Sequence, residues 1–167
     1  MRRMKRLRSL GVVGAAVLAA AVAVLVPGVG TVAATVGPGA QPSPQLVTIV
    51  STMTIAYPAP NYGTFQASGS NLICGSGTVL DSRLVYLRGP GTTGYDLTVD
   101  KTFTCADRSG KIFVRLFAHN VGSGETFGWE ILGGTGRYRH LDGLGVGSTV
   151  GPNANVATNT YTGALVD

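Results

Sequence analysis

From Gln45 onward the chain consists of short runs in which hydrophobic and polar residues alternate, separated by Gly, Pro, Asn and Asp. The clearest runs are "LTVDKTF" and "KIFVRLFAH". Successive side chains of a strand point to opposite faces, so each run has one face richer in apolar residues. The shared faces are Leu97, Val99, Lys101 and Phe103 in the first run, and Ile112, Val114, Leu116 and Ala118 in the second.

The segments between the runs favour an all-β fold with short connections. "ADRSG" is short enough to make a hairpin of its two neighbours, with Gly110 available for a positive φ. Seven or eight strands are expected, and no stretch beyond the N-terminal segment has a helical period. The 25 glycines suit sharply coiled strands and bulges. The sequence therefore predicts an all-β sandwich or a closed barrel, and the glycines suit a small β-barrel. The expected strands are 46–57, 64–73, 74–87, 97–105, 111–120, 126–132 and 155–166.

The N-terminal segment carries the positive charge of the chain. Five of the 13 Lys and Arg residues fall within the first eight positions, and the remaining eight equal the 8 Asp and Glu residues. Nucleic acid is therefore not expected as a partner, because its footprint would lie on the folded domain. The cationic start, the apolar run 10–26 and Pro27 have the layout of a secretory signal. An uncleaved membrane anchor is the alternative, because the run nearly reaches the length of a span.

These features divide the chain into a signal peptide at 1–34, a flexible lead-in at 35–45 and a barrel domain at 46–167.

Cys74 and Cys105 are the only cysteines, and in an exported chain such a pair predicts a disulfide. A loop of about 30 residues would gain roughly 3.5–4 kcal/mol by the chain-entropy estimate. Metal ligation is the alternative, but His119 and His140 are not spaced to complete a site. We expect neither a metal nor another cofactor.

The order of the motifs resembles a known family. "GTFQASGSNLICGSGTV", "VDKTFTCADRSGKIFVRLFAH", "GWEILGGTGRYRHLDGLGVG" and the closing "TYTGAL" are similar to exported actinobacterial proteins of the allene-oxide-cyclase and dirigent barrel-like group. The "GGTGRYRHLDGLG" segment is the most specific part of the likeness. The resemblance implies an eight-stranded antiparallel barrel with an apolar cavity, often trimeric. It transfers no catalytic residue, because the acidic and arginine residues of plant dirigent proteins have no matching positions here.

Three groups of residues are candidates for a site. Glu130 would suit general-acid chemistry if it faced a cavity, but alternation favours Trp129 and Ile131 inside and Glu130 outside. Arg115 and His119 share a face with Phe113 and Phe117. That face would either line the polar end of a ligand cavity or form the outer surface, and branched aliphatics on the opposite face favour the outer surface.

The third group lies in "RYRHLDG". His140 and Asp142 would share a face in a strand, where the carboxylate could orient the imidazole. The flanking glycines favour a turn instead, with Tyr138 and Leu141 filling one barrel end and Gly143 as terminator. Glu130, His140 and Asp142 thus remain candidates for catalysis, and Arg115, His119, Trp129 and Tyr138 for ligand binding.

Two functions fit this sequence. The first is a secreted barrel that binds a small hydrophobic ligand or serves as an interaction module. The second is a cofactor-free cyclase or isomerase acting on a hydrophobic substrate in the barrel cavity, so the sequence leaves open whether the protein is an enzyme. A homotrimer and a small hydrophobic molecule are the expected partners, with membrane contact only through an uncleaved signal.

Overall fold

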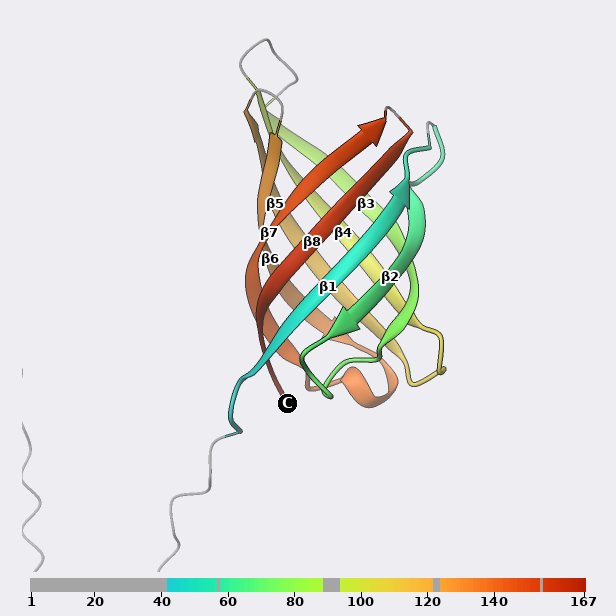
Figure 1. Ribbon diagram of the computed structural model, residues 1–167, viewed down its shortest axis with the longest axis vertical. Helices are drawn as coiled ribbons and strands as arrows, with labels where there is room; N and C mark the ends of the chain where they lie inside the picture. Colours follow the sequence, from blue (N-terminus) through green and yellow to red (C-terminus); the bar gives the residue numbers. More distant parts are fainter. Residues whose placement is uncertain (1–41, 57, 89–93, 122–123, 154) are drawn as a thin grey trace, which may run out of the picture. The chain divides into compact units, whose positions relative to one another are not determined.

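The barrel is closed by eight antiparallel strands, each hydrogen-bonded to its neighbours in the chain, with β8 returning to β1 (Figure 1). A computed structural model describes residues 42–56, 58–88, 94–121, 124–153 and 155–167, so the predicted signal peptide and most of the lead-in lie outside the described residues. The elements are β1 (Gln45–Thr54), β2 (Tyr62–Ser68), β3 (Ser76–Arg88), β4 (Tyr95–Cys105), β5 (Lys111–Val121), β6 (Gly124–Gly134), the 3-10 turn η1 (Gly136–Tyr138), β7 (Asp142–Asn153) and β8 (Val156–Val166). The predicted fold class is confirmed.

The hydrophobic periodicity located most strands correctly and missed two features. The expected strands on either side of "ADRSG" are β4 and β5, and Gly110 has a positive φ of 149°. The Gly-rich segment, however, contains the end of β6, η1 and the first part of β7, so Gly143 does not end the turn but lies inside a strand. The segment 69–75, expected as strand, is instead the connection between β2 and β3.

The interior is formed by alternate residues of every strand. On β4 and β5 the predicted inward faces are both buried, with Ile112 and Leu116 only 1% and 2% exposed. Lys101 is buried among the apolar residues of β4 at 5% exposure. An eight-stranded barrel is just wide enough for side chains to fill its centre, which explains why one face of each strand is almost wholly excluded from water.

Aromatic rings fill the middle of the barrel around Tyr161. The ring centroid of Tyr161 lies 5.8 Å from that of Phe103, 4.9 Å from Phe127 and 6.4 Å from Trp129. Inward-facing glycines provide the space for these rings. A Cβ atom built at Gly147 would lie 2.3 Å from the Phe127 ring, and one at Gly163 would lie 2.5 Å from the Trp129 ring. "GLGVG" therefore places glycine inside, against the aromatic rings, and Leu144 and Val146 outside.

The end of the barrel at which β1 begins, called the base here, is closed by η1 and the disulfide (Figure 1). Tyr138 and Leu141 are 0% and 4% exposed, as expected for the residues that fill this end. The Tyr138 hydroxyl lies 2.6 Å from Ser109 Oγ, in the turn between β4 and β5. Cys74 and Cys105 are joined by a disulfide, which confirms the predicted pairing and ties the β2–β3 connection to the end of β4.

Removing two buried tyrosine hydroxyls should have different effects on stability. Tyr138→Phe removes the hydrogen bond with Ser109, so we expect the free energy of unfolding to fall by about 1 kcal/mol. The Tyr161 hydroxyl is buried, and its contact with the Ser51 side chain does not reach full hydrogen-bond geometry, so Tyr161→Phe should cost less stability than Tyr138→Phe. Urea denaturation of both variants provides the comparison. A loss in Tyr161→Phe as large as that in Tyr138→Phe would contradict this assignment.

Candidate functional site: the cavity at the mouth of the barrel

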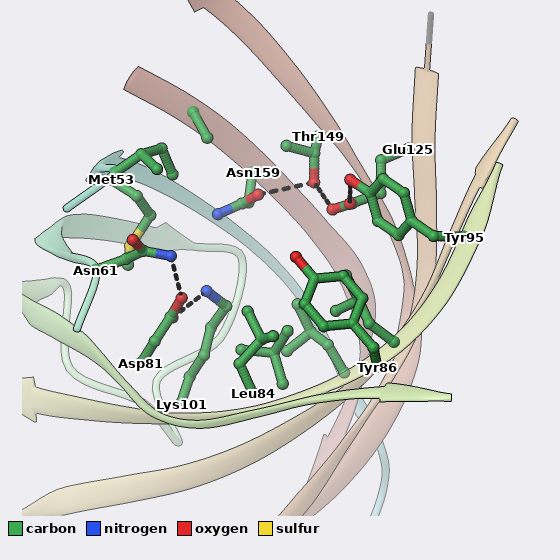
Figure 2. A pocket seen from close by; sticks show the side chains of 15 residues that line it. Met53, Asn61, Asp81, Leu84, Tyr86, Tyr95, Lys101, Glu125, Thr149 and Asn159 are labelled. Atoms are coloured by element: carbon green, nitrogen blue, oxygen red, sulfur yellow. Dashed lines mark hydrogen bonds and ion pairs between the residues drawn. The ribbon is translucent and has the colours of Figure 1, made fainter. Parts of the chain in front are cut away.

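The end of the barrel opposite the base, which we call the mouth, holds the candidate site. A cavity of about 250 Å³ enters here and is bordered by residues from β1, β3, β4, β5, β6, β7 and β8 and from the β1–β2 connection (Figure 2). Deeper in the barrel the apolar interior leaves only about 10 Å³ of free space. The cavity is lined by Met53, Ile55, Asn61, Asp81, Leu84, Tyr86, Tyr95, Leu97, Val99, Lys101, Leu116, Glu125, Thr149, Ala157 and Asn159.

A bulge in β3 decides which of its side chains reach the cavity. The register against β4 shifts between Asp81 and Arg83, leaving Ser82 as the extra residue, and the Ser82 hydroxyl donates to Asp100 O at 3.0 Å. Before the bulge the odd-numbered residues face inward, and after it Leu84 and Tyr86 do so. Bulges commonly redirect side chains in this way. The bulge therefore brings an apolar residue and an aromatic residue to the mouth.

One part of the cavity wall is a buried ion pair. Lys101 Nζ lies 2.5 Å from Asp81 Oδ1, and the two residues are 5% and 8% exposed. The other carboxylate oxygen of Asp81 accepts a hydrogen bond from Asn61 Nδ2 at 2.9 Å. Pairing and hydrogen bonding make burial of these charges tolerable, since an isolated ion in this position would be strongly destabilising.

A second polar group surrounds Glu125 in another part of the wall (Figure 2). The Tyr95 hydroxyl donates to Glu125 Oε2 at 3.0 Å, and the Thr149 hydroxyl lies 2.7 Å from Oε1. Thr149 also contacts Asn159 Oδ1 at 2.8 Å, and Asn159 Nδ2 donates to Ser51 Oγ at 3.2 Å. Burial and the adjacent Glu125 carboxylate raise the pKa of Tyr95 to about 12, so the phenol stays protonated at neutral pH.

Three candidates from the sequence lie on the outer surface of the barrel. Arg115 binds both carboxylate oxygens of Asp100, at 2.7 and 3.0 Å, and pairs in the sheet register with Glu130. His119 contacts the Asp96 carboxylate and is 52% exposed. The interpretation of this face as the outer one is confirmed, because its opposite face is buried. Glu130 likewise alternates with the buried Trp129, and none of the three lines the cavity.

The other four candidates are also outside the cavity lining. Trp129 is buried in the aromatic centre, where its Nε1 donates to the Val146 and Thr162 carbonyls at 3.2 and 3.3 Å. Tyr138 lies at the base. His140 and Asp142 are exposed, and Asp142 accepts a hydrogen bond from the amide of Gly143.

Four residues of the cavity wall were not among the candidates from the sequence, namely Asp81, Lys101, Glu125 and Asn159. Lys101 gave a usable signal, because a lysine on an otherwise apolar strand face requires a buried partner of opposite charge. The bulge at Ser82 gave none, since alternation alone would have continued through it. Among the described residues, the one group of potential metal ligands is Cys74, Cys105 and Asp107, and the disulfide already occupies both of its sulfur atoms.

Comparison with known proteins gives this chain no family. No protein-family model, curated protein or solved structure matches it. The eight-stranded antiparallel barrel is established by the structure, whereas membership of the allene-oxide-cyclase and dirigent barrel-like group stays a prediction. No described segment forms a helix with the length and apolar character needed to cross a membrane.

The buried ion pair predicts a specific pattern of stabilities. Lys101→Met leaves the Asp81 charge buried beside Asn61 alone, so the free energy of unfolding should fall by about 3 kcal/mol. Adding Asp81→Asn removes that charge and should recover part of the loss. Urea denaturation of both single variants and the double variant gives the coupling energy. Additive losses would show that the two side chains do not interact as described.

The outer ion pair predicts a pH dependence. The hydrogen bonds from Arg115 hold the pKa of Asp100 below its usual value, so the pair contributes stability above the unfolded pKa of about 4. That contribution is lost as pH falls through the lower folded pKa. Asp100→Asn should therefore lower the unfolding midpoint at pH 7 and have a smaller effect at about pH 2. An equal effect at both pH values would contradict this.

Proposed function

We propose that the protein is a secreted barrel that binds a small molecule in the mouth cavity. The observation that carries the proposal is a cavity of about 250 Å³ that combines apolar and polar walls above a tightly packed base. Small-molecule sites have this composition, and this volume lies just below their usual range of roughly 300–1,000 Å³. The ligand is therefore a compact molecule.

The residues of the wall favour an amphiphilic ligand over a purely hydrophobic one. Leu84, Leu97, Val99 and Leu116 offer apolar contact to the body of a ligand. Asn61, Asp81, Lys101, Glu125 and Asn159 also border the cavity. A wholly apolar guest would cover these groups without replacing their contact with water, which is unfavourable. A ligand with one polar end and one apolar end satisfies both parts of the wall.

Secretion is part of this proposal and rests on two features of the chain. The cationic start followed by the apolar run 10–26 has the layout of an export signal. The disulfide between Cys74 and Cys105 suits an oxidising compartment.

A cofactor-free cyclase or isomerase acting in the same cavity is the second candidate. The observation that favours it is that two carboxylates, Asp81 and Glu125, border the cavity together with the Lys101 ammonium group. Positioned acids and bases of this kind can assist proton transfer to a bound substrate. An enzyme would convert a bound molecule, whereas a binding protein would release it unchanged, so mass analysis of the molecule after incubation separates the two.

Two alanines of β8 provide a matched test of binding. Ala157 lines the cavity, whereas Ala164 alternates with buried Leu165 and pairs with exposed Leu46 and Leu144 on the outer surface. Ala157→Trp should fill the cavity and abolish binding of small amphiphilic fragments observed by NMR. Ala164→Trp should bind the same fragments as the wild type.

The same two variants, Ala157→Trp and Ala164→Trp, can also contradict the proposed binding site. Fragments that bind Ala157→Trp as well as they bind the wild type would place the site elsewhere. Thermal denaturation of both variants verifies that each remains folded, since added volume can destabilise a packed site by about 1–3 kcal/mol.

A further inference from the structure

The mouth cavity carries an excess of negative charge among its described lining residues. Its charged side chains are Asp81, Lys101 and Glu125, which gives two carboxylates for one ammonium group. Lys101 is held by Asp81 at 2.5 Å, so this pair is neutral as a unit. Glu125 forms no ion pair with a basic residue in the described part of the chain. The unbalanced charge of the cavity is therefore that of Glu125.

The hydrogen bonds of Glu125 fix its position without satisfying it completely. Tyr95 and Thr149 each contact one of its oxygens, at 3.0 and 2.7 Å. A carboxylate can accept about four hydrogen bonds, so acceptor positions remain for a ligand. Tyr95 stays neutral because its pKa is raised, so it adds no second negative charge.

One aromatic residue, Tyr95, contacts this carboxylate, and a second, Tyr86, packs against Tyr95. Tyr86 and Tyr95 both line the cavity, and their ring centroids are 6.0 Å apart at an interplanar angle of 75°. Aromatic faces attract organic cations through the ring quadrupole, by about 0.5–1 kcal/mol at exposed sites and more when water is excluded. A carboxylate in contact with one of two packed rings is thus suited to an ammonium group carrying apolar substituents.

We propose that the mouth cavity selects a small organic cation, an amine or quaternary ammonium group joined to a compact apolar body. The cationic end lies against Glu125, Tyr86 and Tyr95, and the apolar body contacts Leu84, Leu97 and Leu116. This inference rests on the proposed binding function and adds the charge and chemical class of the ligand.

Three probes of similar size and different charge test the selection. At pH 7, 2-phenylethylamine is a cation, 2-phenylethanol is neutral and 3-phenylpropanoate is an anion. For the wild-type protein, isothermal titration calorimetry should give a Kd for the amine about tenfold lower than for the alcohol. The anion should bind most weakly, because Glu125 repels it.

Strand β6 supplies a matched pair of variants. Glu125 faces the cavity and Glu130 lies on the outer surface of the same strand, so the same change can be made on either side of the wall. Glu125→Gln should remove the preference for the amine over the alcohol and leave the Kd of the alcohol nearly unchanged. Glu130→Gln should keep the full preference. Tyr86→Leu should reduce the preference for the amine severalfold, because it removes one aromatic face that attracts the cation. The variant should remain folded, because the Tyr86 side chain is 53% exposed and lies outside the packed centre.

The outcomes separate this inference from the proposed function. Equal affinities of the wild type for amine and alcohol, or a preference that survives Glu125→Gln, would overturn the assignment of an organic cation while leaving small-molecule binding in place. Failure of the wild type to bind any of the three probes, and any fragment in the Ala157 and Ala164 comparison, would overturn both.

Discussion

The limited width of an eight-stranded barrel governs the rest of this structure. Such a barrel has space for one layer of side chains directed at its axis, so large residues on one strand require small ones opposite. Here the rings of Phe127, Trp129 and Tyr161 meet near the centre, and Gly147 and Gly163 give them room. The centre is consequently solid, and open space is left only where no large aromatic residue fills the axis.

The packing of the centre also explains where polar groups are found. Ser51, Asp81, Lys101 and Asn159 are buried, yet Asp81, Lys101 and Asn159 all border the mouth cavity. There they form hydrogen bonds with one another or with neighbouring polar groups, so their burial does not leave isolated charges. The base has a different composition, with Tyr138, Leu141 and the disulfide forming its closure. The two ends of the barrel thus differ, with a closed and covalently tied base and a mouth lined by charged and polar side chains.

Alternation and turn chemistry in the sequence were sufficient to predict an all-β fold, the inward faces of β4 and β5, and the closing residues Tyr138 and Leu141, whereas the choice of an eight-stranded barrel over a sandwich came from the family resemblance. The disulfide followed from cysteine number. The residues of the candidate site were harder to predict, because they come from strands far apart in the chain and meet only when the barrel closes. Asp81 and Lys101 are 20 residues apart, and Glu125 lies on a third strand. The candidates chosen from local motifs, such as His140 with Asp142, were neighbours in the chain that do not meet around a cavity.

The bulge at Ser82 has a consequence for how this barrel could change during evolution. It interrupts the alternation of β3 between the part that packs the centre and the part that lines the mouth. Flattening the bulge without changing the length of β3 would exchange Leu84 and Tyr86 for Arg83 and Val85 on the cavity wall, without moving the residues that precede it. A family of barrels with the same base could therefore acquire differently lined cavities through the gain or loss of a single bulge.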